Sequence, residues 1–174
     1  TALLKNSVLG ITESDSAQAR LQVSYTLGRE SLKVGWEGSL RIEGRNAIIW
    51  DDDKEAAAFV TAKDPTILKF SRNMASSLPS SGAAIPSENL RSGALIFQAL
   101  EAFGLRYVVD PKGSYATMKG VKSAVDYLQF PVETLAYRTG DCDDLSTLYN
   151  AMLEALGIET AYITVPGHIY SAFA

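Results

Sequence analysis

Hydrophobic and polar positions alternate with a period of two in the first quarter of the chain. The segment "ARLQVSYTL" carries apolar residues at every second position, namely Leu21, Val23, Tyr25 and Leu27. The segment "SLKVGW" repeats the pattern as far as Trp36. This period predicts half-buried antiparallel strands, joined by a turn through Gly28 in "LGRE". With further strands predicted in "NSVLGIT" and "LRIEGRNAIIW", they would form a small β domain over residues 1–50.

From residue 51 onwards, apolar residues recur every three or four positions, which is the spacing of amphipathic helices. The segment "KDPTILKFSRNMASSL" predicts a first helix with Asp64 as its N-cap. A loop follows in "LPSSGAAIPS", and a second helix is expected from a cap at Ser87 to a stop at Gly104. We therefore interpret residues 51–86 as a helical connector to a larger domain.

Residues 87–174 predict a domain in which helices and antiparallel strands occupy separate segments, so we expect an α+β fold. The segment "LRYVVD" is a strand candidate that ends at the turn "DPKG". A helix from Pro131 to Gly140 precedes the helix "DCDDLSTLYNAMLEALG". The expected buried stripe of this last helix consists of Leu145, Leu148, Met152 and Leu156. The strands "ETAYITV" and "IYSAFA" would then pair across "PGH".

The bulk composition narrows the class of protein. A chain of 174 residues with 47% hydrophobic residues can build a core without disulfides, and its single cysteine excludes an internal one. A net charge of −4 argues against nucleic acid as a partner, because phosphate binding needs a basic surface. No apolar run reaches the roughly 20 residues of a membrane helix, and no signal peptide is recognised. Because the chain begins with Thr1 rather than Met, we interpret it as a processed or partial product.

The only cysteine, Cys142, falls at the first position of a predicted helix whose best N-cap is Asp141. A thiol at a helix N-terminus faces unpaired backbone N–H groups and the positive end of the helix dipole, which favour the reactive thiolate. The same N–H groups can hold an oxyanion. The only histidine, His168, follows after one helix and one strand, and it is the candidate base.

The neighbouring aspartates oppose this chemistry, because like charge raises the pKa of a thiol. A helix dipole contributes only about 0.3–1 kcal/mol at an exposed site. We therefore expect a positive group to compensate the charges of the aspartates. The candidates are an imidazolium at His168, the guanidinium of Arg138 and a bound cation. The alternative is that Cys142 is a small buried residue, His168 is structural and the acids are helix caps. The first turn of a helix beside three acids is a poor place to bury sulfur, which favours the chemical interpretation.

The segment "GDCDDLSTLYNAMLEALGIETAYITVPGH" closely resembles the core of bacterial transglutaminase-like cysteine peptidases, and the similarity covers roughly residues 127–172. The resemblance implies a papain-like arrangement in which the cysteine helix packs on an antiparallel sheet that carries the histidine. It also implies that Cys142 is the nucleophile and His168 the general base and then acid of an acyl transfer. Candidates for supporting the oxyanion are the Cys142 backbone N–H, Gln129 and Asp141.

In the family a third residue, Asp or Asn, orients the histidine from the next strand. This chain ends six residues after His168, so we expect a fragment whose third catalytic residue would lie beyond Ala174. Some periplasmic relatives bind calcium through acids beside the cysteine, and the residues of matching type are Asp141, Asp143 and Asp144. Because calcium takes six to eight oxygens, these carboxylates supply only part of a site, and we expect no obligatory cofactor.

Our leading functional hypothesis is a cysteine protease or acyltransferase that acts on a peptide or protein amide through a thioester. The alternative is a non-catalytic, protein-binding module of the same fold within a larger exported protein, which the N-terminal β domain would suit. A third hypothesis is a calcium-dependent structural domain. Similarity to exported relatives favours an extracytoplasmic or periplasmic location.

Overall fold

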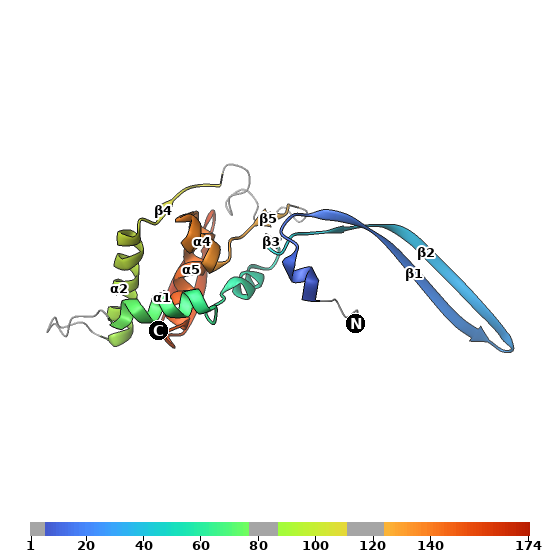
Figure 1. The fold of residues 1–174 in the computed structure, drawn as a ribbon, viewed down its shortest axis with the longest axis horizontal. Helices are drawn as coiled ribbons and strands as arrows, with labels where there is room; N and C mark the ends of the chain where they lie inside the picture. Colours follow the sequence, from blue (N-terminus) through green and yellow to red (C-terminus); the bar gives the residue numbers. More distant parts are fainter. Residues whose placement is uncertain (1–5, 77–86, 111–123) are drawn as a thin grey trace. The chain divides into compact units, whose positions relative to one another are not determined.

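The structure is a computed structural model of the chain and describes residues 6–76, 87–110 and 124–174 (Figure 1). It divides into two compact units, Thr1–Ala47 and Ile48–Ala174. Helices and antiparallel strand pairs occupy separate segments of the chain, which confirms the α+β class. The sequence pattern predicts the end of the first domain at residue 50 and a second boundary at residue 86.

The first unit is built on a long β-hairpin. Strands β1 (Asp15–Leu27) and β2 (Glu30–Ile42) pair antiparallel over their whole length, and Gly28 turns the chain with a positive φ of 63°. The strand predicted in "NSVLGIT" is wrong, because η1 (Asn6–Gly10) is a 3₁₀-helix. Its backbone bonds close locally, as the bond from the Ile11 N–H to the Val8 carbonyl (3.1 Å) shows.

One face of this hairpin is apolar. The register pairs Leu21 with Trp36 and Val23 with Val34, so alternate side chains from both strands share a face. These side chains are exposed, Leu21 by 61% and Trp36 by 49%. The predicted strands are confirmed, but the predicted half-burial is wrong, because these side chains are exposed.

The second unit begins with a series of capped helices. The short 3₁₀-helix η2 spans Asp53–Phe59. Helix α1 (Pro65–Ser76) is capped as predicted, since Asp64 Oδ1 accepts the Thr66 N–H at 2.8 Å. Helix α2 (Glu88–Phe103) is capped by Ser87 and ends at Gly104, whose φ is 92°. The loop predicted between α1 and α2 lies mostly outside the described residues.

The strands and helices of the C-terminal part position the site. Helix α4 spans Pro131–Tyr137, and helix α5 spans Cys142–Glu154. Strand β4 (Arg106–Tyr107) pairs parallel with β6 (Thr139–Gly140), and β7 (Thr160–Val165) pairs antiparallel with β8 (His168–Phe173). The remaining pair is β5 (Asp126–Tyr127) with β3 (Ala47–Ile48), whose second residue opens this unit.

The predicted end of α4 at Gly140 is wrong. The helix ends at Arg138, which has a φ of 60° and donates its N–H to the Thr134 carbonyl. The next two residues, Thr139 and Gly140, can therefore leave the helix and pair with β4 as β6. This pairing brings β4 directly beside the start of α5.

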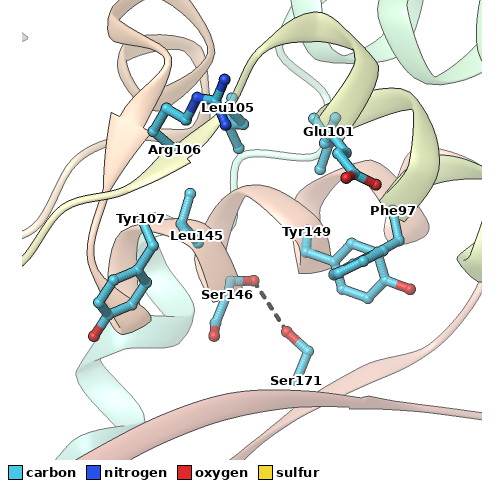
Figure 2. Close-up of a pocket in the computed structure, with 10 residues that line it drawn as sticks. Phe97, Glu101, Leu105, Arg106, Tyr107, Leu145, Ser146, Tyr149 and Ser171 are labelled. Atoms are coloured by element: carbon cyan, nitrogen blue, oxygen red, sulfur yellow. Dashed lines mark hydrogen bonds between the residues drawn. The ribbon is translucent and has the colours of Figure 1, made fainter.

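Helix α5 is the central element of the second unit. Ten of its 13 residues are buried, which is far more than the one-sided stripe that the sequence predicts. Leu148 and Met152 lie in the core as predicted, whereas Leu145 is only partly buried and lines a groove on one side of the helix (Figure 2). Among the described residues, no helix is both long enough and apolar enough to span a membrane.

Candidate active site

Cys142 is the first residue of α5 and its side chain is buried, at 7% exposure. It belongs to an apolar cluster that includes Phe59, Leu128 and Ile169. The three aspartates beside it are buried as well; they are Asp141, Asp143 and Asp144. The prediction that three neighbouring acids would keep this sulfur from being buried is therefore wrong, because the acids are buried together with it.

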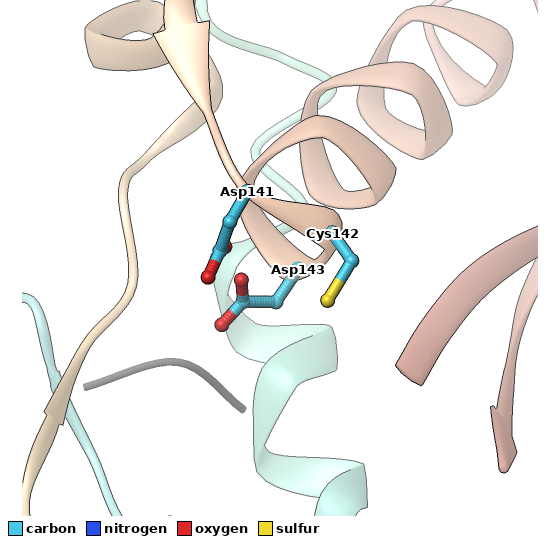
Figure 3. A group of neighbouring side chains, drawn as sticks. All are labelled: Asp141, Cys142 and Asp143. Atoms are coloured by element: carbon cyan, nitrogen blue, oxygen red, sulfur yellow. The ribbon is translucent and has the colours of Figure 1, made fainter. Parts of the chain in front are cut away.

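Asp141 and Asp143 form a hydrogen-bonded pair of acids beside the thiol (Figure 3). Burial, followed by the hydrogen bond to Asp141, raises the pKa of Asp143 to about 10. Near neutral pH, Asp143 therefore keeps its proton, which it donates in the hydrogen bond to Asp141. Its negative charge is removed by this proton, so the thiol needs less positive compensation than the sequence suggests.

The third acid, Asp144, is fixed by Gln129. The backbone N–H of Gln129 donates to Asp144 Oδ1, and its side-chain Nε2 donates to Oδ2, both at 2.8 Å. Burial raises the pKa of Asp144 to about 7, although the bond from the Gln129 backbone opposes the rise. The side-chain amide of Gln129, predicted as an oxyanion donor, is thus engaged with Asp144 in this structure.

The thiol itself is held in its protonated form. Burial raises the pKa of Cys142, and the carboxyl groups of Asp143 and Asp141 act in the same direction when they are ionised. Backbone N–H groups of Ile169 and of Cys142 itself face the sulfur and lower its pKa, but the net change is upward.

Two neighbours of the site carry no signal in the sequence. Burial, and then the proximity of Cys142 and Asp141, raises the pKa of Tyr107, which places its phenol beside the thiol. Trp50 Nε1 donates to Asp126 Oδ2 at 2.7 Å, and burial raises the pKa of this acid. Tyr107 comes close to the thiol because β4 pairs with the short strand β6. The strand pattern of "LRYVVD" could not reveal this proximity.

His168 begins β8 on the face of the strand pair that points away from α5. Side chains along a strand alternate between faces, and its neighbour Ile169 is buried against α5 whereas His168 and Tyr170 are exposed. The rings of His168 and Tyr170 stack with centroids 6.0 Å apart. In the described part of the chain, no hydrogen bond joins His168 to Cys142.

Arg138, the other predicted compensating group, is engaged elsewhere. Its guanidinium lies 4.4 Å from the centre of the Phe103 ring, which is a cation–π arrangement. The predicted catalytic roles of Cys142 and His168 therefore stay predictions, and the structure brings the acids, rather than the basic groups, to the thiol.

A calcium ion does not fit these residues well. One ligand atom each from Asp141, Cys142 and Asp143 lies within 4.8 Å of the others. Calcium prefers six to eight oxygens, and one of these three groups is a thiol. Both oxygens of Asp144 already accept bonds from Gln129. We therefore derive no step of function through a metal.

Comparison with known families assigns the region that contains this site. Residues 104–170 match the model of the transglutaminase-like superfamily, a segment that includes β4, α4, α5, β7 and the start of β8. No curated protein matches the sequence.

Two solved structures are similar to the chain. One is a "putative protease" from Parabacteroides distasonis, with 14% identity and a TM-score of 0.40 over 87% of this chain and 31% of that chain. The other is a "putative cysteine protease" from Cytophaga hutchinsonii, with 12% identity and a TM-score of 0.42 over 94% of this chain and 61% of that chain. The chain thus spans less than two thirds of either protein. By the family match, residues 104–170 are similar to the core of the transglutaminase-like superfamily.

Proposed function

We propose that the second unit acts as a thiol hydrolase or acyltransferase on a peptide or protein amide, with Cys142 as its nucleophile. The observation that carries this proposal is the position of the Cys142 sulfur, which lies at the N-terminus of α5 and faces the backbone N–H groups of Ile169 and of Cys142. This arrangement joins a potential nucleophile to a preformed set of oxyanion donors.

The reaction would proceed through a thioester. The thiolate attacks the amide carbonyl carbon, the oxygen becomes an oxyanion at the two N–H groups, and the C–N bond breaks to release an amine. Water or a second amine then attacks the thioester and restores the thiol. His168 would take the thiol proton and pass it to the leaving amine. This role requires the imidazole of His168, which lies on the outer face of β8 in this structure, to reach the thiol.

A peptidase assay on denatured protein and on fluorogenic peptides tests this function. We expect Cys142→Ser to abolish turnover, and His168→Ala to lower kcat by about 100-fold or more, in the range of general acid–base catalysis. Val165→Ala is the matched control, because Val165 pairs with His168 across the strands and carries no titratable group. Full activity of the His168→Ala variant would contradict the assignment of the base.

A non-catalytic binding module is the second candidate, and two observations favour it. The pKa of Cys142 is raised, and His168 points away from the thiol. This function predicts that activated peptide esters leave Cys142 unmodified under native conditions. Mass spectrometry would detect an acyl group on Cys142. Its presence in the wild-type protein and its absence from the His168→Ala variant would contradict a non-catalytic binding module and support a catalytic thiol.

A further inference from the structure

A groove lies along α5, and one of its lining residues, Tyr107, adjoins the thiol of Cys142. The volume of the groove is about 510 Å³, within the range of roughly 300–1,000 Å³ that is typical of ligand pockets. Helices α2 and α5 and strands β4 and β8 contribute its lining (Figure 2). Its lining includes Phe97, Tyr107, Leu145, Ser146 and Tyr149.

The groove follows the face of α5 that carries Cys142. Residues i, i+3, i+4 and i+7 share one face of a helix, and in α5 these are Cys142, Leu145, Ser146 and Tyr149. This stripe extends about 10 Å from the cysteine, at 1.5 Å per residue. Tyr107 lines the groove and also adjoins the thiol, so it marks the end of the groove that reaches the sulfur.

Close packing limits the other end of the groove. A Cβ at Gly93 would come within 2.6 Å of Phe173 Cζ and 2.9 Å of Tyr149 Oη, which shows how closely α2 approaches α5 and β8 there. Tyr149 and Phe173 also form an edge-to-face pair with centroids 6.2 Å apart. The groove therefore has room for a chain segment that starts at the sulfur and is about two helical turns long.

The lining is suited to apolar contact. Phe97 and Tyr107 are large aromatic residues that are 65% and 56% exposed on either side, and exposed aromatics gathered in one place are typical of binding sites. Both serine hydroxyls of the lining are satisfied internally: Ser171 Oγ donates to the Ser146 carbonyl at 3.2 Å, and Ser146 Oγ donates to the Ile169 carbonyl at 3.4 Å. Glu101 and Arg106 carry opposite charges, so the lining as a whole attracts neither sign.

We propose that this groove is the specificity pocket of the thiol, and that it holds a large apolar side chain, aromatic or leucine-like, of the substrate residue next to the scissile amide. This inference rests on the proposed function only in that Cys142 is the reacting thiol. Peptides with a small or charged side chain at that position would leave the apolar lining in water and bind less well.

Alkylation of Cys142 with matched reagents tests the groove without any need for turnover. The second-order rate constants for iodoacetamide and for N-(2-phenylethyl)iodoacetamide are measured by mass spectrometry at one pH on the whole chain. Their ratio does not depend on the thiolate fraction. We expect the phenylethyl reagent to react about tenfold faster, because its ring is removed from water in the groove.

Phe97→Ala should reduce this preference by about threefold or more, since part of the apolar lining is lost. Leu90→Ala is the matched control, because Leu90 lies on the same helix, is 44% exposed and does not line the groove. Both positions are exposed, so both variants should keep the fold, which circular dichroism verifies.

The outcomes separate the groove from the proposed function. Equal rates for the two reagents, or a preference that Phe97→Ala leaves unchanged, would overturn the groove proposal while the peptidase assay still decides the function. Alkylation by neither reagent, even at high pH, would mean that the thiol is inaccessible and would overturn both.

Discussion

Gln129 and Asp144 are joined by two hydrogen bonds, one from the backbone N–H and one from the side-chain amide of Gln129, each 2.8 Å long. The pair ties the segment before α4 to the first turn of α5. The position of the thiol therefore depends on a buried carboxyl group two residues away along the helix, as well as on the helix itself.

Replacement of Asp144 by Asn should destabilise the second unit by about 1–3 kcal/mol, because an amide group would face one of the two buried donors of Gln129 and leave it unsatisfied. Asp143→Asn is the matched control. Its amide can still donate to Asp141 and accept the Asp144 N–H, as the protonated acid does now. Urea unfolding measures the stability of both variants. Equal losses of unfolding free energy would contradict the two hydrogen bonds from Gln129 to Asp144.

Gly140→Ala should cost about 1–3 kcal/mol of stability through overpacking. Its Cβ would lie 2.5 Å from Asp144 Cβ and 3.0 Å from Oδ2, so the backbone or the carboxyl group must shift. Gly93→Ala should cost less, because the atoms that it meets are the far ends of the Phe173 and Tyr149 side chains. Denaturant unfolding of both variants checks this order, and a neutral Gly140→Ala would contradict the close approach.

The stability of the second unit should fall as the pH rises from about 4 to 7. Burial raises the pKa of Asp144 to about 7 and that of Asp143 to about 10, above the value of an unfolded aspartate. The folded state therefore binds more protons in this window, and the slope of the unfolding free energy is negative, on the order of 1 kcal/mol per pH unit for each of the two groups. Asp144→Asn should remove the contribution of Asp144 and leave that of Asp143, so the slope below pH 7 should become less steep. Urea unfolding at pH 5, 6 and 7 measures this slope. A stability that rises with pH would contradict the raised pKa values of Asp143 and Asp144.

The thiol of the free protein should titrate above the ordinary cysteine value of about 8.5. Burial is the main cause, and the charge of Asp141 adds to it. Asp141→Asn should therefore lower the pKa seen in the pH profile of iodoacetamide alkylation, whereas Asp15→Asn on the exposed hairpin should leave it unchanged. A pKa that does not respond to Asp141→Asn would show that this carboxyl group does not act on the sulfur.

Amide hydrogens of β1 and β2 should exchange much faster than those of α5. A two-stranded hairpin is marginally stable alone in water, and the apolar face of this one is exposed. Helix α5 is buried on nearly all sides, so its amides exchange only through large openings. Hydrogen exchange followed by mass spectrometry compares the two segments in one experiment. Equal protection would mean that the apolar face is covered in solution.

The sequence allowed prediction of those features that depend on local chemistry. The caps at Asp64 and Ser87, the stop at Gly104 and the placement of Cys142 at the start of a helix all follow from preferences of neighbouring residues. The hairpin strands likewise follow from alternation, which reports which residues share a face. Alternation does not report whether another element covers that face, and for this reason the burial of Leu21 and its neighbours was predicted wrongly.

The features that the sequence did not reveal depend on contacts between distant segments. Tyr107 meets the thiol only because β4 pairs with β6, and these strands are two residues long. The charge state of Asp143 depends on its burial and on its bond to Asp141, neither of which is visible in "GDCDDL". Arg138 has the positive charge that the thiol requires, but Phe103 is its neighbour in space.

The alternation of side chains in β8 has a consequence for how this thiol could be controlled. Because the side-chain period of a strand is two, a slip of one residue in register would move His168 to the inner face and Ile169 to the outer one. An arrangement with the imidazole on the thiol side and one with it on the outer side would then differ by one residue in the register of β8.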